Sequence, residues 1–491
     1  MREQEQFLYV LDRDEAERRF RAAIDATPRG VESVRLDAAL GRVLASDVVS
    51  PVDVPSFDRS NVDGFAVVSD STFGASEEIP RRLQLSEETI HTGVVPSTVI
   101  HQGTAVSIAT GGMVPRGADA VVMVEHAEVR NNELHVTRAV TAGTGISFAG
   151  TDITAGETVL RFGRILSSRD TGVLAAIGVE RVDVWRRPIV AILSTGDEII
   201  APGEPMGPAK VYDSNAQILA DAVRELGGEP LRFGITGDDL PMLRERLRQA
   251  VASADIVLLS GGTSKGAGDL SYRAVAELQD PGIVAHGVAL KPGKPICLAA
   301  THGKPVVVLP GFPTSAIFTF HEFVAPVIRE QAGRDSSEPV FVPARLAVKV
   351  NSEIGRTEYL LVGLVESAVE GSDEQPNDIS LAAYPMGQGS GSVTTFSRAD
   401  GFATIDRHEE IVEAGTMLGV QLLDKELQLA DLIVIGSHCI GLDYLLGALQ
   451  QRGVRSKFLA VGSTAGLDAA KRGECDLAGI HLLLACCAAT L

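Results

Sequence analysis

Residues 187–199 read RPIVAILSTGDEI, an apolar run that ends in a short polar turn. Residues 214–228, SNAQILADAVRELGG, then have the spacing of an amphipathic helix closed by glycines. The same alternation continues through LPMLRERLRQAVAS (240–253), ADIVLLSGGTS (254–264) and PVVVLPGFPTSA (305–316). Strands that are apolar on both faces and alternate with helices are typical of a parallel sheet covered by helices. We therefore predict a central, doubly wound α/β domain over residues 186–333.

The rest of the chain divides around this domain, which makes the fold class multidomain α/β plus β. Short apolar runs separated by Gly, Pro, Asn and Thr predict an inserted β-rich module over residues 50–145. Residues 1–49 and 146–185 flank it and are predicted to form a linker or stalk, with helical stretches at 12–25, 36–44 and 167–178. Beyond the central domain we expect a small β domain at 338–423 and a short α/β tail at 428–491.

Composition excludes several classes of protein. The 491 residues include 44 Lys and Arg against 64 Asp and Glu, and the resulting net charge of −20 argues against a general nucleic-acid binder. A few local lysines can still attract a small anion. No apolar run approaches the length of a membrane span, and the N-terminus does not resemble a secretory signal. The five cysteines form no CxxC pair, which favours a reducing cytoplasm.

Polar loops follow three of the expected strands, where α/β proteins bind ligands. One glycine-rich turn is common in any α/β protein, but three in one domain indicate an anion site. None of them has the GK[ST] ending of a phosphate-binding Walker loop. The candidate residues are Glu198 in the first loop, Gly261, Gly262, Ser264 and Asp269 in the second, and Pro310, Pro313 and Ser315 in the third.

The stretch KPGKP places Lys291 and Lys294 around a Pro-Gly turn. An ordinary surface turn with solvated lysines and a pair of ammonium groups aimed at one oxyanion both fit this pattern. The carboxylates of Glu198, Asp238 and Asp269 would suit a divalent cation that bridges phosphate oxygens. Each acidic residue alone is more often a helix cap or turn residue, so only the whole set favours a site.

The β-rich module carries two further candidates. SFDRSNVDGFAV (56–67) places Asp63 directly before an expected strand, where it could be only part of a tight turn. ATGGMVPRGADAVVMVE (109–125) places Thr110 before two glycines.

Taken in order, these motifs, together with the Asp-Ser-Asn of VYDSNAQIL, resemble those of the MoeA/gephyrin-type molybdopterin molybdotransferases over about residues 15–423. The resemblance implies that the central domain is of the molybdopterin-binding type. It also implies insertion of molybdate into adenylylated molybdopterin, with Mg²⁺ present and AMP released. Two residues depart from the family pattern: Phe312 stands where Asn is more usual, and Gly287 where some members have a lysine.

The resemblance assigns roles by motif. Catalytic roles fall on Asp63, Thr110, Asp152, Glu198, Asp238 and Asp269, of which Glu198, Asp238 and Asp269 would hold the metal. Substrate-binding roles fall on Lys291, Lys294, Gly261, Gly262, Ser264, Pro310, Pro313, Ser315, Arg356 and Ser390, with the lysines holding molybdate.

The resemblance further implies a homodimer with shared active sites, and a molybdopterin adenylyltransferase as a possible partner. Alternatives are a non-catalytic scaffold that only holds molybdopterin or molybdate, and another enzyme that shares the α/β domain, such as a pyridine-nucleotide deamidase or a molybdopterin adenylyltransferase. The intact acidic set favours an enzyme over the scaffold. The other enzymes lack the SFDRSNVDG module and the LKPGKP order, which disfavours them.

The tail resembles the start of the periplasmic-binding-protein-like domain that is fused to some of these enzymes. The likeness ends at AGIHLL, before LACCAATL. We expect a truncation or a change of reading frame near residue 483, the alternative being a naturally short tail.

Overall fold

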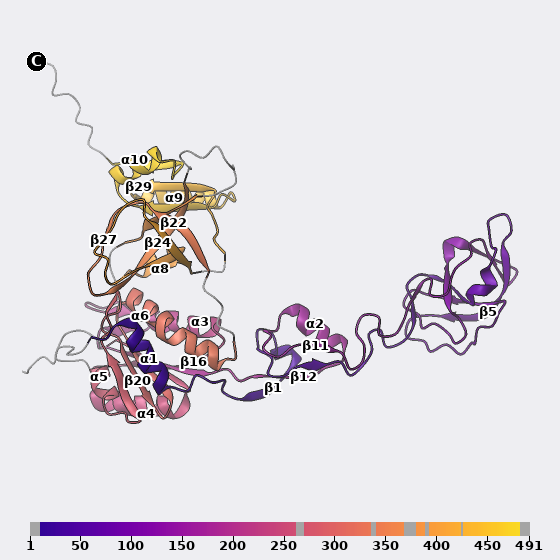
Figure 1. Ribbon diagram of the computed structural model, residues 1–491, viewed down its shortest axis with the longest axis horizontal. Helices are drawn as coiled ribbons and strands as arrows, with labels where there is room; N and C mark the ends of the chain where they lie inside the picture. The colour runs from indigo at the N-terminus through magenta and orange to yellow at the C-terminus, as the bar shows by residue number, and fades with distance from the viewer. Residues whose placement is uncertain are drawn as a thin grey trace, which may run out of the picture. The chain divides into compact units, whose positions relative to one another are not determined.

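The structure is a computed structural model that describes residues 10–261, 270–334, 340–367, 380–387, 392–423 and 426–481. Within these ranges the chain forms two compact units, which Figure 1 draws as ribbons. One unit spans residues 30–186, and the other joins the N-terminal residues before it to everything from Arg187 onward. No helix in the described part of the chain is long and apolar enough to cross a membrane.

The α/β domain contains a six-stranded sheet in the order β16-β13-β17-β21-β20-β18. The first four strands are parallel, as predicted, but β20 pairs antiparallel with both β21 and β18 and so runs in the opposite direction. His302 and Gly303, both with positive φ, form the tight turn that makes β20 and β21 a hairpin. The strands are β13 (Ile189–Thr195), β16 (Glu229–Thr236), β17 (Ile256–Ser260), β18 (Pro281–His286), β20 (Cys297–Thr301) and β21 (Lys304–Leu309).

Helices cover both faces of this sheet, because alternate strand residues point to opposite sides. Val190 and Ile192 belong to a buried cluster that also contains residues of α3 and α7, whereas Ala191 and Leu193 pack with residues of α4. The helices are α3 (Ser214–Glu225), α4 (Leu240–Ser253), α5 (Leu270–Val275), α6 (Pro313–Thr319) and α7 (Ala325–Gln331), with a π-helical turn (Phe320–Val324) before α7.

The N-terminal helix α1 (Arg13–Ala23) also packs on this domain. Ala16 and Phe20 are buried in the same cluster as α3 and α7. The sequence prediction placed this helix in the stalk, whereas the structure joins residues 10–29 to the α/β unit.

The small β domain closes on itself, because β26 pairs with both β24 and β28. Residues 393–398 form a helix, α8, within the region that was predicted as a small β domain. A further strand, β19 (Leu290–Lys291), comes from the α/β domain and pairs with β24. The strands are β22 (Phe341–Leu346), β24 (Thr357–Ser367), β25 (Ser380–Pro385), β26 (Gly401–Ile405) and β28 (Met417–Leu422), beside the short pair β23 (Val350–Asn351) and β27 (Ile411–Val412).

The tail folds as a three-stranded parallel sheet in the order β30-β29-β31 with two helices. Leu459 and Ile435 of the tail pack against Val365 and Tyr384 of the β domain, and Figure 1 shows these elements side by side. The buried Glu474 carboxylate accepts hydrogen bonds from the Tyr384 hydroxyl and from the Arg345 guanidinium. The elements are β29 (Leu432–Gly436), α9 (Ile440–Gln450), β30 (Ser456–Ala460), α10 (Ser463–Lys471) and β31 (Leu477–Gly479).

The unit of residues 30–186 contains a β module and a stalk. The module is a six-stranded sheet in the order β7-β4-β6-β5-β9-β8: β4 (Gly64–Val67), β5 (Arg81–Ile90), β6 (Thr104–Ile108), β7 (Ala120–Met123), β8 (Ala127–Arg130) and β9 (Glu133–Val136). The stalk pairs β1 (Val31–Arg35) with β12 (Arg181–Trp185) and β2 (Val48–Val49) with β11 (Thr158–Leu160), beside the predicted helix α2 (Ser168–Ala176).

The tail provides a test of its own packing. Leu459 is 3% exposed, and its truncation in Leu459→Ala should lower the free energy of opening of the tail by about 2–5 kcal/mol, because it leaves a cavity in the shared cluster. Native-state hydrogen exchange of the β29 amides measures this opening. Leu477→Ala is the matched control, because Leu477 is 51% exposed in the same sheet. Equal protection in both variants would show that the tail does not depend on this contact.

Candidate functional site

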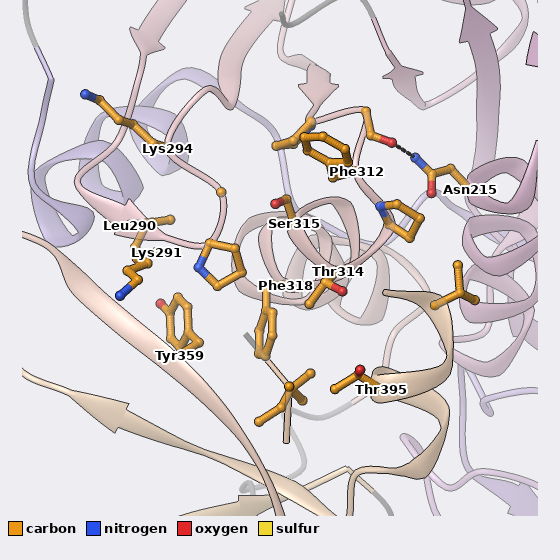
Figure 2. Close-up of a pocket in the computed structure, with 18 of the residues that line it drawn as sticks. Asn215, Leu290, Lys291, Lys294, Phe312, Thr314, Ser315, Phe318, Tyr359 and Thr395 are labelled. Atoms are coloured by element: carbon orange, nitrogen blue, oxygen red, sulfur yellow. Dashed lines mark hydrogen bonds between the residues drawn. The ribbon is translucent and has the colours of Figure 1, made fainter. Parts of the chain in front are cut away.

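A cavity of about 1240 Å³ lies at the carboxyl edge of the parallel strands, within the unit that contains the α/β and β domains. Its walls come from the loops after β13, β17 and β21 and from β24 of the β domain. Figure 2 shows the residues of the two domains facing one another across it. The position agrees with the expectation that ligands of open α/β sheets bind beyond the strand ends.

The lysine turn joins the two domains at this cavity. Leu290 and Lys291 lie in parallel register with Thr357 and Glu358, and the Thr357 N–H donates to the Ala289 carbonyl at 2.9 Å. Gly293 sits in the turn with φ +116°, where a Cβ atom would lie 2.5 Å from Thr319 Cγ2. Only glycine therefore fits this tight approach of the turn to α6.

Four basic side chains among the described residues line the cavity, and three of them have carboxylate partners. Lys291 Nζ lies 3.1 Å from the buried Glu358 carboxylate. The other two pairs are Arg356 with Glu353 at 2.7 Å and Lys349 with Glu413 at 3.2 Å.

Lys294 is the fourth, and it has no carboxylate within ion-pair distance among the residues that the structure describes. In Figure 2 the side chains of Lys291 and Lys294 extend in different directions from the turn, so their ammonium groups do not converge on one point. The cation with the least compensated charge is thus Lys294.

The acidic loop after β13 reaches the same cavity through Glu198. The Asp238 backbone N–H donates to Asp197 Oδ1 at 3.0 Å, which holds the loops after β13 and β16 together. Burial raises the pKa of the Asp238 carboxyl above its ordinary value, and the carboxylates of Asp197 and Glu198 raise it further. The structure therefore brings Glu198 and Asp238 close enough to repel one another.

These two carboxylates are the kind of hard oxygen donor that Mg²⁺ prefers. Across the described ranges there is no group of three or more His, Cys, Asp or Glu side chains that could hold a metal ion. Magnesium usually takes one or two carboxylates together with water and substrate phosphate, so the pair still fits it.

The glycine and proline turns predicted from the sequence line the cavity as expected. Gly261, Pro310, Pro313 and Ser315 all contribute to its wall. Gly261 has φ +108°, and a Cβ atom there would lie 2.3 Å from the Thr195 carbonyl oxygen. The other predicted residues of this part, Gly262, Ser264, Asp269 and Ser390, lie outside the described residues.

Aromatic side chains form a wall that the sequence analysis missed. Phe318 of α6 stacks on Tyr359 of β24 with ring centroids 5.4 Å apart, and both line the cavity. Burial, followed by the nearby Glu322 carboxylate, raises the pKa of Tyr359, which therefore stays a neutral phenol. Phe312, the departure from the family pattern, also lines the cavity and is 62% exposed.

Comparison with known proteins agrees with this geometry. Residues 11–178 match the MoeA N-terminal region (domain I and II), residues 191–330 a probable molybdopterin binding domain, and residues 343–423 the MoeA C-terminal region (domain IV). The chain is 35% identical over 374 residues to a molybdopterin molybdenumtransferase of Nostoc sp., covering 73% of this chain and 85% of that protein. The chain belongs to the MoeA family.

Two further relatives support this placement. Molybdopterin molybdenumtransferase 2 of Mycobacterium tuberculosis is 34% identical over 331 residues, which cover 67% of this chain and 82% of that protein. The crystal structure of a molybdopterin biosynthesis MoeA protein from Pyrococcus horikoshii is 36% identical, with a TM-score of 0.70, covering 85% of this chain and 100% of that chain. The three family matches end at residue 423, so the tail's likeness to a periplasmic-binding protein stays a prediction.

The remaining predicted residues of this MoeA-family chain lie in the other unit. Asp63 and Thr110, 47 positions apart, are in direct contact: Asp63 Oδ1 accepts from the Thr110 N–H at 2.7 Å and from its hydroxyl at 3.0 Å. These bonds, the backbone one first, lower the pKa of Asp63. Asp152 is exposed and bonds through its N–H to the Val54 carbonyl. Within the described ranges it forms no hydrogen bond or ion pair with Asp63 or Thr110.

The Asp63–Thr110 pair predicts a titration. Thr110→Val removes the hydroxyl donor and keeps the backbone donor, so the pKa of Asp63 should rise but remain below its ordinary value. Carboxyl-detected NMR titration measures it, and Thr110→Ser should restore the depression. An unchanged pKa in the valine variant would contradict the hydroxyl contact.

Proposed function

We propose that this protein is a molybdopterin molybdotransferase, which inserts molybdate into adenylylated molybdopterin and releases AMP. The chain has a role in molybdenum cofactor biosynthesis, and its relatives are named for the transferase. The observation that carries the proposal is the single cavity in which the lysine turn, Arg356 and Glu198 meet. A dianion and a phosphate-bearing substrate both need such a combination of cationic and acidic groups.

The basic residues have different parts in this proposal. Lys294, which has no carboxylate partner among the described residues, attracts molybdate into the cavity. Lys291 forms an ion pair with Glu358, which also accepts a hydrogen bond from the Ser352 hydroxyl at 2.7 Å. These contacts fix the position of Lys291 in the wall. Arg356 presents the N–H donors of its guanidinium group to the substrate from the β domain.

Glu198 and Asp238, with Asp269 as the third predicted ligand, would hold Mg²⁺. Burial, and after it the carboxylates of Asp197 and Glu198, raises the pKa of Asp238, and a bound cation would relieve the repulsion among these carboxylates. Magnesium bound there would neutralise charge on the substrate phosphates.

We further propose a homodimer in which Asp63, Thr110 and Asp152 of one subunit complete the site of the other, and a molybdopterin adenylyltransferase as the partner that supplies substrate. We place the reaction in the cytoplasm: none of the three cysteines in the described part forms a disulfide, as a reducing compartment allows.

The direct test is incubation of the protein with adenylylated molybdopterin, molybdate and Mg²⁺, with AMP release and metal insertion followed together. Release of AMP that depends on molybdate supports the proposal. Binding of molybdopterin or molybdate without AMP release would instead favour the non-catalytic scaffold.

Lys294 gives a sharper prediction. Lys294→Ala removes one charged contact to a dianion, which is worth about 1.5–3 kcal/mol, or about a 10- to 150-fold loss in apparent molybdate affinity. The measurement is the molybdate concentration needed for half-maximal AMP release. Lys471→Ala, which removes an equal charge from exposed α10, is the control and should change nothing. An unchanged molybdate requirement in Lys294→Ala would exclude Lys294 as an oxyanion ligand.

The shared site predicts complementation between inactive subunits. Asp63→Asn and Glu198→Gln should each be poor enzymes, and subunit exchange between them should restore part of the activity. One of the two sites in each mixed dimer then has both carboxylates. Light scattering first checks that both variants are dimers. Verified exchange without recovered activity would rule out the shared site.

A further inference from the structure

The Asp-Ser-Asn motif of residues 213–215 has a part in the cavity that the proposed anion chemistry leaves unexplained. Asn215, near the start of α3, is only 9% exposed and lines the cavity wall. Its Nδ2 donates to Ser260 Oγ at 2.8 Å and to the Gly311 carbonyl at 2.9 Å, the second bond being drawn as a dashed line in Figure 2.

These two bonds fix the orientation of the amide. A backbone carbonyl can only accept, so the nitrogen of Asn215 has to face Gly311. The free atom is therefore the carbonyl oxygen, Oδ1, which is buried and has no hydrogen-bond partner among the described residues. A buried acceptor that lacks a hydrogen bond and lines a ligand cavity is expected to accept one from the ligand.

Ser194 provides a second polar group of this kind at the same end of the cavity. It is 3% exposed, it lines the cavity, and its hydroxyl also lacks a partner in the described part of the chain. Ser194 and Ser260 are in register on the neighbouring strands β13 and β17, so their side chains leave the sheet on the same face. Asn215 is bonded to Ser260, which places the two unmet groups over adjacent strand ends.

The two unmet groups themselves are uncharged, and the nearest charged lining residues along the chain, Glu198 and Asp213, are acidic. A carbonyl oxygen repels phosphate and molybdate but accepts from N–H groups. Figure 2 shows Asn215 on the opposite side of the drawn residues from Lys291 and Lys294, so its unmet oxygen lies apart from these two cations.

We propose that the Asn215 carbonyl and the Ser194 hydroxyl bind the amino-pyrimidinone edge of the substrate's pterin ring. This inference rests on the proposed function. The edge presents two adjacent N–H donors, the 2-amino group and ring N3–H, beside a carbonyl acceptor. Asn215 Oδ1 accepts from the donors, and the Ser194 hydroxyl, which can donate or accept, meets the rest of the edge.

The test compares competitive inhibitors of AMP release in wild type, Ser194→Ala and Asn215→Ala. The probes are pterin, its 2-oxo analogue lumazine, and AMP. Loss of one neutral hydrogen bond should raise the inhibition constant of pterin and the KM for adenylylated molybdopterin about 2- to 13-fold, with the molybdate requirement unchanged. Wild type should prefer pterin to lumazine, and Asn215→Ala should lose that preference. Ser253→Ala, an exposed hydroxyl at the end of α4, is the matched control.

Two results would overturn the inference. If the variants weaken inhibition by AMP rather than by pterin, Asn215 and Ser194 bind the adenine ring instead. Unchanged constants for every probe, in variants that melt like wild type, would mean that the unmet groups hold only water. Either result leaves the proposed function standing, because that function fails only if wild type itself releases no AMP in response to molybdate.

Discussion

The ladder between β19 and β24 is the contact on which the cavity depends. It is only two residues long, yet it brings the loop after β18 against a strand more than sixty positions later in the chain. Glu358 explains why this ladder forms. Its carboxylate is only 8% exposed and needs the Lys291 ammonium and the Ser352 hydroxyl as partners. The same ion pair that joins the domains therefore also places Lys291 in the wall.

The α/β domain could be predicted from sequence because its strands are apolar on both faces and its helices are amphipathic. Residues 36–44 show where such patterns mislead. LDAALGRVL has helical spacing, but the structure contains only a short 3₁₀ turn there. Gly41 adopts φ +73°, and Val43 and Leu44 form bridges to distant residues of the stalk. Pairing with partners more than a hundred positions away outweighed a weak local preference for helix.

The residues of the candidate site also fall into two groups, those that could be placed from the sequence and those that could not. Glu198, Gly261 and Ser315 could be placed together because parallel strands end at one edge of a sheet. Lys349 and Tyr359 could not, since in sequence they are ordinary members of a β domain, and nothing local shows which strand of that domain meets the lysine turn. The sequence also contains no sign that Lys291 would pair with Glu358, or that Lys294 would have no carboxylate partner within the described ranges.

The position of α1 has a consequence for how the chain is made. This helix is synthesised before β18 and β20, which follow more than 250 residues later, yet it packs on both of them. Between them lies the whole unit of residues 30–186, whose two ends are paired in β1 and β12 and which has its own core. A ribosome-bound chain can therefore complete that unit while Phe20 still lacks its neighbours. In a growing chain the N-terminal helix is thus made early and buried late, and its apolar face stays open to chaperones in the interval.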